Sequence, residues 1–165
     1  WLISFGIESG DQKILDNIGK KIKKENIIKT FKMLSKKNVL TMCYYIFGLP
    51  DENESSIKKT IKFAKSLKSN FAYFYHAVPY PGTKLFNEMT ANGKICSFDW
   101  SDYDMADCQV SVKSDQKRIN RNIRKAYITY YLSPGILLKN IWSTKISLKE
   151  KLNLFFFLFI YCIRK

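Results

Sequence analysis

A nearly unbroken apolar run, Val39-Leu-Thr-Met-Cys-Tyr-Tyr-Ile-Phe47, is followed by the polar, turn-forming Gly48-Leu-Pro-Asp-Glu52. The run is rich in β-branched and aromatic residues, which favour strands. A continuous apolar segment of this length is typical of a strand covered on both faces, as in parallel sheets. We therefore predict a buried strand that ends in a loop at Gly48.

The same unit occurs before and after this run. Leu2-Ile-Ser-Phe5 ends in Gly6-Ile-Glu-Ser-Gly10, and Phe71 to Val78 ends in Pro79-Tyr-Pro-Gly-Thr83. Apolar residues at helical spacing follow each loop, with helix starts predicted at Asp11, Asn53 and Thr83. Strands and helices that alternate in this way indicate parallel strands joined by right-handed crossovers. Three such strands are too few to close a barrel, so we expect part of one.

A different pattern begins after Lys94. We predict three regions: 1–94 with the strands, an irregular linker over 95–113, and a helical extension over 114–165. A basic helix is expected over Ser114 to Leu132, a second from Ser133-Pro134, and a last one capped by Ser147.

The last predicted helix contains the charge-free run Leu154-Phe-Phe-Phe-Leu-Phe-Ile160. About 20 apolar residues are needed to span a bilayer, so this run is too short. Burial against the rest of the protein is the favoured interpretation, and an interfacial membrane anchor beside Arg164 and Lys165 is the alternative. We expect a cytoplasmic protein, peripheral to the membrane if the anchor is real.

Charge and cysteine content leave several classes open. Lys and Arg number 28 against 14 Asp and Glu, a net charge of +14. An excess of this size is compatible with nucleic acid, an anionic membrane or an acidic substrate, and also with a lysine-rich composition without a partner. The four cysteines, at 43, 96, 108 and 162, form no closely spaced pair, so reduced structural thiols are expected. The first ten residues lack a secretory signal, and Trp1 suggests a sequence that begins inside a longer protein.

The three loops that follow the strands carry the candidate chemistry. Ligands of parallel α/β sheets bind at the carboxyl ends of the strands, where these loops should meet. Each loop contains glycine, and the first two contain the carboxylates Glu8 and Glu52. Carboxylates suit a ligand with hydroxyl and ammonium groups. The sequence contains no GxGxxG or GxxxxGK[ST] motif, which leaves nucleotide phosphate binding without support.

Four segments together resemble the second half of a radical S-adenosylmethionine (SAM) core domain, in the subgroup that often carries a cobalamin-binding domain. They are Phe5 to Gly10, Leu15 to Lys20, Tyr45 to Glu52 and Pro79 to Thr83, and the resemblance covers roughly Trp1 to Gly93. It implies an α/β fold that is the C-terminal half of a partial (βα)6 TIM-like barrel, followed by an α-helical tail. It also implies a [4Fe-4S] cluster that reductively cleaves SAM to a 5′-deoxyadenosyl radical, for cobalamin-dependent methylation or oxidative cyclisation.

The resemblance also implies roles for particular residues. Glu8 and Ser9 would lie at the ribose and methionine parts of SAM, and Ile46 and Gly48 would pack along the adenine. Glu52 would stabilise the loop beneath it. The rim beside the substrate would be formed by Pro79, Gly82 and Thr83, joined by His76 if that strand face is the barrel interior. A packed, hydrogen-bonded histidine is the alternative for His76.

The sequence departs from the family pattern in two respects. The cluster motif CxxxCxxC and the first three strands are absent, and Tyr44 stands where many members have a glycine. Since an iron–sulfur cluster needs clustered thiolates, the chain alone is expected to be inactive. In the full protein we expect a reductant for the cluster and a small-molecule or lipid substrate. A non-catalytic remnant that binds only cofactor or a partner is one alternative. An RNA-modifying relative is another, and the least favoured, because aromatic and basic residues do not interleave.

Overall fold

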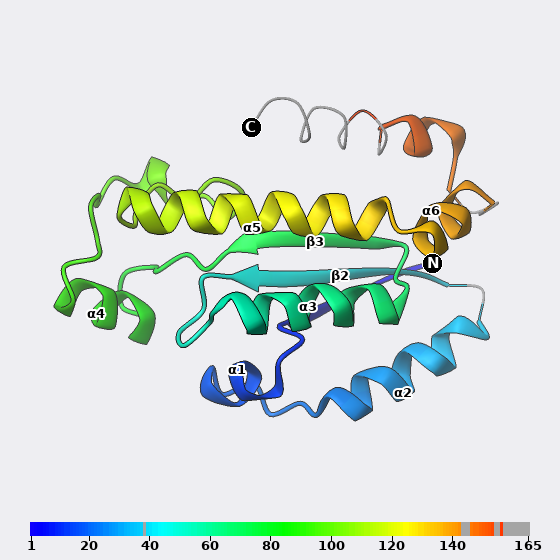
Figure 1. Ribbon diagram of the computed structural model, residues 1–165, viewed down its shortest axis with the longest axis horizontal. Coiled ribbons are helices and arrows are strands. Elements are labelled where there is room, and N and C mark those ends of the chain that lie inside the picture. Colours follow the sequence, from blue (N-terminus) through cyan, green and yellow to red (C-terminus); the bar gives the residue numbers. More distant parts are fainter. Residues whose placement is uncertain (38, 143–145, 154–155, 157–165) are drawn as a thin grey trace.

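The computed structural model describes residues 1–37, 39–142, 146–153 and 156. Three strands, β1 (Leu2–Glu8), β2 (Leu40–Phe47) and β3 (Phe71–His76), form one parallel sheet in the order β1-β2-β3. Between and after them lie α1 (Gln12–Asn17), α2 (Lys24–Ser35), α3 (Glu54–Leu67), α4 (Lys84–Ala91), the 3₁₀ turn η1 (Trp100–Asp102), α5 (Lys113–Tyr131) and α6 (Pro134–Ile141) (Figure 1). The predicted fold class is confirmed: a parallel α/β sheet of the kind found in part of a TIM-like barrel precedes a helical tail.

Local sequence signals set the helix boundaries. Asp11 caps α1 by accepting a hydrogen bond from the Lys13 amide, and Gly19 then turns the chain with a φ of 72°. Asn53 begins α3 with a capping box, in which its side chain and that of Ser56 satisfy each other's backbone amides. The predicted stripe of α3 is buried in full, which fixes the face that α3 turns to the sheet: Ile57, Ile61, Ala64 and Leu67.

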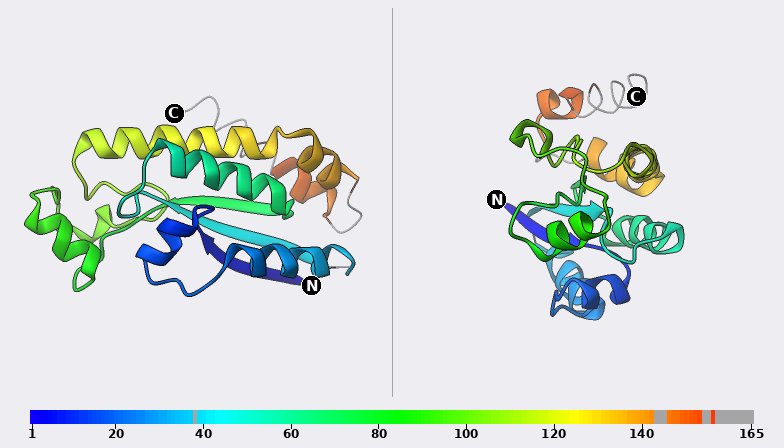
Figure 2. Two further views of the ribbon diagram at one scale, coloured as in Figure 1. Left: turned by 60° about the horizontal axis from the view of Figure 1, so that its bottom comes forward. Right: turned by 90° about the vertical axis from the view of Figure 1, so that its left-hand side faces the viewer.

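One face of the sheet is covered by helices. Helices α3 and α5 cover this face together with α2 (Figure 2), and alternate residues of β2 and β3, including Tyr45, Phe47 and Phe74, are buried beneath α3 and α5. Phe31 of α2 packs beside Phe5 of β1. The helical tail therefore shares the main hydrophobic core with the strands. Segment 95–111 folds back on itself through the Ile95–Ser111 bridge and forms a small second core around Tyr103, Cys108 and Val110.

The other face of the sheet, which we call the open face, carries no helix among the described residues. The residues on it are exposed or half-buried and include Ser4, Gly6, Glu8, Met42, Tyr44, Ile46, Phe71, Tyr73 and Tyr75. The prediction that β2 is covered on both faces is therefore wrong for this chain. The rings of Tyr44, Tyr73 and Tyr75 on the open face partly cover one another, so these side chains are half-buried.

The helix capped by Ser147 is present over residues 148–153. The Glu150 amide donates to the Ser147 hydroxyl, and the Ser147 amide donates to the Glu150 carboxylate, as in a capping box. Most of the apolar run over 154–160, and Arg164 and Lys165, lie outside the described residues. Among the residues that the structure describes, no helix has the length and apolar character required to cross a membrane.

Candidate functional site

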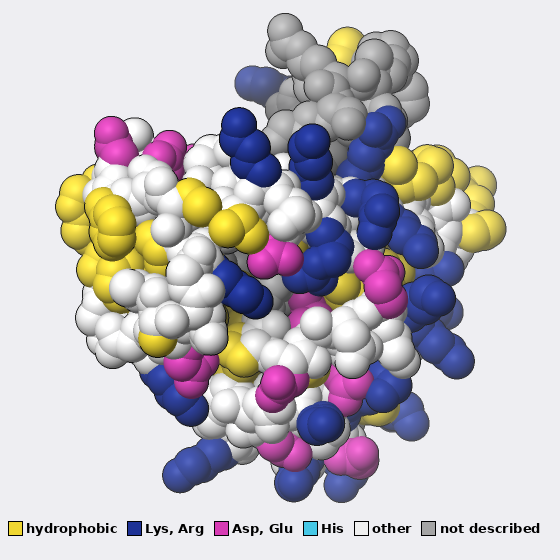
Figure 3. Space-filling view, turned by 60° about the vertical axis from the view of Figure 1, so that its left-hand side comes forward, with side chains coloured by type: hydrophobic (Ala, Val, Ile, Leu, Met, Phe, Trp, Pro, Cys, Tyr) yellow, Lys and Arg dark blue, Asp and Glu magenta, His cyan; other side chains and the backbone are white. Residues whose placement is uncertain are grey.

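The strand register brings the three loops to one edge of the sheet. Glu8 at the end of β1 pairs with Tyr45, and Phe47 at the end of β2 pairs with His76 of β3. The Ala77 amide then donates to the Phe47 carbonyl at 2.8 Å. The loops that begin at Ser9, Gly48 and Ala77 therefore leave the same carboxyl edge, as the sequence predicted. Figure 3 shows the molecule largely from this edge, where acidic and basic side chains surround a hollowed centre.

Glu8 presents a carboxylate on the open face at this edge. Its φ of 63° is left-handed, and its side chain is 19% exposed. The carboxylate forms an ion pair with Lys20 at 2.6 Å, and the same ammonium group donates to the Gly6 carbonyl. A Cβ on Gly6 would lie 2.5 Å from the Glu8 carboxylate, so a larger residue there would require the Glu8 side chain to shift. The pair shows that this carboxylate accepts an ammonium group in the position expected for a cofactor contact.

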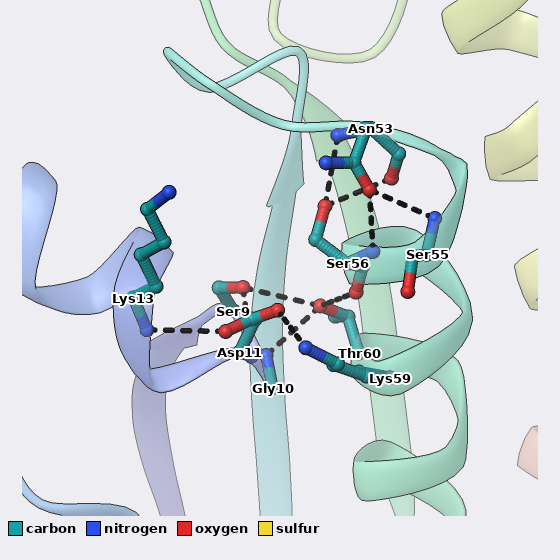
Figure 4. Close-up of polar contacts among 9 residues, drawn as sticks. All are labelled: Ser9, Gly10, Asp11, Lys13, Asn53, Ser55, Ser56, Lys59 and Thr60. Carbon is teal, nitrogen blue, oxygen red and sulfur yellow. Dashed lines mark hydrogen bonds and ion pairs between the residues drawn. The ribbon is translucent and has the colours of Figure 1, made fainter.

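Ser9 lies away from the open face. Its fully buried hydroxyl is 3.1 Å from that of Thr60 in α3 and accepts a hydrogen bond from the Asp11 amide (Figure 4). The Gly10 amide donates to the same Thr60 hydroxyl at 2.9 Å, and a Cβ on Gly10 would lie 2.6 Å from the Thr60 Cα. Ser9 and Gly10 thus fasten the first loop to α3. The predicted SAM contact by Ser9 has no geometric support, because the hydroxyl is already bonded inside the core.

An ion pair reinforces this attachment. Lys59 of α3 lies 2.8 Å from the Asp11 carboxylate, and the hydrogen bond from Lys59 holds the pKa of Asp11 below its ordinary value (Figure 4). The start of α1 is therefore fixed to α3 by one salt bridge as well as by the Thr60 hydrogen bonds.

The end of β2 and the loop that follows it contribute Ile46, Gly48 and Glu52. Ile46 is half-buried on the open face, at the position predicted for adenine packing. Gly48 has a φ of 90°, and a Cβ there would lie 2.7 Å from the side chain of Ile119 in α5. The close approach that requires glycine is therefore made by the protein's own helix. A ligand was the predicted neighbour, and sequence could not reveal that α5 fills this space.

Glu52 holds the second loop together. Its Oε2 accepts a hydrogen bond from the Gly48 amide at 2.6 Å, which agrees with its predicted loop-stabilising role. Its Oε1 is buried and has no partner among the described residues. Burial raises the pKa of Glu52 to about 7, although the Gly48 hydrogen bond acts in the opposite direction. The side chain borders a hollow of about 350 Å³ between this loop, α4 and the start of α5, which also contains Asp115 and Arg118.

His76 lies on the helix-covered face. Its ring nitrogen Nε2 is 2.8 Å from the Asn120 side-chain oxygen of α5, and the residue is 2% exposed. A substrate role was predicted for His76 only if this face of β3 were the barrel interior, and the structure places His76 on the face that the helices cover. The packed and hydrogen-bonded alternative describes it, because α5 covers this face of β3.

The third loop forms an outer rim. Pro79 is buried, whereas Gly82 and Thr83 are exposed. Gly82 has a φ of 85°, which favours glycine, and the Thr83 hydroxyl accepts the Phe86 amide to cap α4. Their predicted place beside the substrate stays a prediction.

Three tyrosines lie together on the open face: Tyr44, which stands where many family members have a glycine, and Tyr73 and Tyr75, for which the sequence favoured a packing role. Tyr44 lies 5.8 Å from Tyr73 and 6.1 Å from Tyr75, measured between ring centroids, with interplanar angles of 29° and 25°. The Tyr44 hydroxyl also donates to the Met42 sulfur. Partial burial raises the pKa of Tyr73 and Tyr75, so their hydroxyls are neutral. The alternation of β3 predicts Tyr73 and Tyr75 on the face opposite His76, and the structure shows them there. They form an aromatic wall beside the carboxyl edge.

The described residues do not fit an iron–sulfur cluster. No group of three His, Cys, Asp or Glu side chains among them could hold a metal ion. Cys43 is buried on the covered face, where desolvation raises the pKa of its thiol to about 11, Cys108 is buried in the small second core, and Cys96 is exposed. Cys162 lies outside the described residues.

Comparison with known proteins agrees with this geometry. Residues 2–64, which include β1, β2 and their loops, match the model of the radical SAM superfamily. This stretch of the chain belongs to the radical SAM superfamily. An uncharacterized methyltransferase of Pyrococcus horikoshii is 38% identical over 141 residues, which cover 85% of this chain and 31% of that protein.

Two further relatives have named reactions. The bacteriochlorophyllide d C-12(1)-methyltransferase of Chlorobaculum tepidum is 33% identical over 104 residues, 62% of this chain and 22% of the relative. The anaerobic magnesium-protoporphyrin IX monomethyl ester cyclase of Rubrivivax gelatinosus is 27% identical over 101 residues, 61% of this chain and 18% of the relative. This radical SAM chain thus spans less than a third of the length of these curated relatives.

Proposed function

We propose that this chain forms the part of a radical SAM methyltransferase that binds the ribose and methionine portions of SAM. The observation that carries the proposal is the convergence of three loops at one sheet edge, where Glu8 presents a carboxylate that already accepts an ammonium group. A carboxylate makes charge-assisted hydrogen bonds with hydroxyl and ammonium groups, both of which SAM offers. Two relatives named as methyltransferases support the reaction class.

Lys20 has a defined part in this proposal. Its ammonium group occupies the Glu8 carboxylate and the Gly6 carbonyl together. A cofactor ammonium that binds Glu8 would share or displace Lys20, and the neighbouring Gly6 leaves the room for it. Ile46, on the same face, would supply apolar contact to the adenine.

The iron–sulfur cluster must be held elsewhere in the full-length protein, because the described residues do not supply its ligands. When bound, the cluster would supply the electron that cleaves SAM, and a reductant would supply that electron to the cluster. Cobalamin is a further proposed cofactor, supported only by the methyltransferase names, and no role of the described residues depends on it.

The aromatic wall indicates the class of substrate that the site would bind. Tyr44, Tyr73 and Tyr75 offer an extended apolar surface with neutral hydroxyls beside the carboxyl edge. Aromatic faces of this kind favour a flat, apolar small molecule. The names of two relatives, which refer to a bacteriochlorophyllide and a magnesium protoporphyrin, are consistent with such a substrate.

The binding role of Glu8 can be tested by calorimetry on the full-length protein. Glu8→Gln should weaken SAM binding by about tenfold or more, the usual scale for losing a charge-assisted hydrogen bond. Glu25→Gln, at an exposed carboxylate in the first turn of α2, is the matched control and should leave the affinity unchanged. Equal affinities of the wild type and Glu8→Gln would refute the proposed contact.

Ring formation is the second candidate reaction, because one relative is named as a cyclase. The two reactions differ in what remains of SAM. Methyl transfer from SAM leaves S-adenosylhomocysteine, whereas hydrogen abstraction alone leaves 5′-deoxyadenosine and methionine. Chromatography of the products formed by the reduced full-length enzyme should show S-adenosylhomocysteine that depends on substrate. Its absence, with substrate-dependent 5′-deoxyadenosine present, would favour ring formation.

A further inference from the structure

The charged side chains at the amino end of the sheet, opposite the candidate site, are all basic. Three chain segments that build it, 30–41, 62–72 and 128–142, contain no Asp or Glu. They contain these lysines: Lys32, Lys36, Lys37, Lys62, Lys65, Lys68 and Lys139. The acidic residues of the strand region lie at or near the carboxyl edge, so the molecule is electrically polarised along its strands.

A large cavity opens at this amino end. Its volume is about 710 Å³, and its apolar lining includes Phe31, Leu34 and Leu67. Its charged lining consists of Lys32, Lys37, Lys68 and Lys139, without a carboxylate among the lining residues. A cavity with an apolar floor and a cationic border suits a ligand that combines an anionic group with an apolar body.

Helix α6 lies beside this cavity and turns an apolar stripe outward. Ile136 and Asn140 face the protein, and the Asn140 side chain donates to the Asn70 carbonyl at 3.0 Å. Lys139 fixes the helix to the C-terminal end of α3 by donating to the Lys68 carbonyl at 2.6 Å. The opposite side of α6 consists of four residues that are 42% to 80% exposed: Leu137, Leu138, Ile141 and Trp142.

The next helix repeats the pattern. Leu148 and Leu152 lie four residues apart on one side of this helix and are 73% and 50% exposed. Lys149 and Lys151 lie between them in the sequence, and Lys151 donates to the Ile141 carbonyl at the end of α6. Exposed apolar stripes bordered by lysines are the pattern of helices that lie in the interface of an anionic bilayer.

We propose that this amino-end surface, defined as the lysine-lined cavity and the outward stripe of α6, docks on an anionic lipid bilayer. The lysines contact lipid phosphates, and Leu138 and Trp142 insert at the level of the head groups. Figure 1 shows α6 at one end of the strands and α4 beyond the other, so the candidate site faces away from this surface. The proposal does not depend on the reaction that the enzyme catalyses.

Vesicle flotation of the full-length protein tests this. The protein should float with vesicles of phosphatidylcholine that contain about one third phosphatidylglycerol, and not with pure phosphatidylcholine; binding should weaken several-fold between about 0.1 M and 0.5 M salt. Trp142→Gln and, separately, Leu138→Gln should reduce the binding by about tenfold. Trp100→Gln is the matched control, because Trp100 in η1 is similarly exposed, at 69%, and lies outside the docking surface.

Charge is tested in the same assay. The triple variant Lys32→Gln, Lys37→Gln, Lys68→Gln should lose binding by about tenfold to a hundredfold. Lys58→Gln, Lys117→Gln, Lys125→Gln removes the same charge from exposed positions of α3 and α5 outside the docking surface and should bind nearly as the wild type does.

Several results would overturn the proposal. These are no flotation with anionic vesicles, equal flotation of Trp142→Gln and Trp100→Gln, and equal loss in the two lysine variants. A Trp142→Gln variant that becomes monomeric from a dimer while still binding vesicles would show that a second copy covers the surface. Each of these results leaves the SAM-binding proposal untouched, because that proposal is measured by calorimetry at the opposite edge.

Discussion

The Tyr131 hydroxyl of α5 bonds both backbone groups of Ala72 in β3, accepting from its amide and donating to its carbonyl at 3.0 Å each. The neighbouring outward amides of β3 are also bonded, that of Phe74 to the Tyr127 hydroxyl and that of His76 to the Met105 carbonyl. An exposed strand edge is a common site of unwanted pairing. Here the protein's own tyrosines occupy the edge, which ties the helical tail to the sheet by backbone bonds as well as by apolar packing.

Tyr131→Phe should lower the free energy of unfolding by about 1–3 kcal/mol, because two buried backbone groups of Ala72 lose their partner. Urea unfolding followed by circular dichroism measures this. A stability equal to that of the wild type would mean that water or another side chain satisfies Ala72.

The same substitution at Tyr45 should have the opposite outcome. The Tyr45 hydroxyl is fully buried and has no partner at hydrogen-bond geometry among the described residues; the weakly polar Cys43 thiol and the Tyr130 hydroxyl are its electrostatic neighbours. Tyr45→Phe removes a polar group whose burial is uncompensated, so the free energy of unfolding should be unchanged or higher by up to about 1 kcal/mol. A loss of more than about 1 kcal/mol would contradict this prediction.

Gly10→Ala should detach the first loop from α3. The new Cβ would lie 2.6 Å from the Thr60 Cα and 2.9 Å from the Lys59 carbonyl oxygen, and backbone atoms cannot move aside cheaply. We expect a loss of about 1–3 kcal/mol in unfolding free energy. Gly135→Ala in α6 is the matched control, since its nearest neighbour would be 4.0 Å away, and it should be neutral or stabilising. Equal effects of the two substitutions would argue against the close packing seen here.

Glu52 should make stability fall as the pH rises from about 4.5 to about 7. Its pKa is raised to about 7 in the folded protein from 4.5, so the folded state holds a proton that the unfolded state has released. Across this window Glu52→Gln should gain roughly 1–3 kcal/mol relative to the wild type, allowing for partial solvent screening. Unfolding curves at pH 5 and pH 8 test this, with Glu25→Gln as the exposed control. Parallel pH profiles of the wild type and Glu52→Gln would show that the carboxyl is not perturbed.

Local signals predicted the framework of this fold well. The caps at Asp11, Asn53, Thr83 and Ser147, and the buried stripe of α3, depend on neighbours within a few residues and were predicted correctly. The positions of Ser9, Gly48 and His76 depend on Thr60, Ile119 and Asn120, which lie far along the sequence. Period-two alternation separated the two faces of β3 but gave no means to know which face α5 would cover.

The tyrosine cover on β3 has a further consequence for assembly. With that margin closed, an additional strand from any source can join the sheet only alongside β1. Any strands that the full-length protein adds to this sheet would therefore join it beside β1, so the sheet can be extended in one direction only.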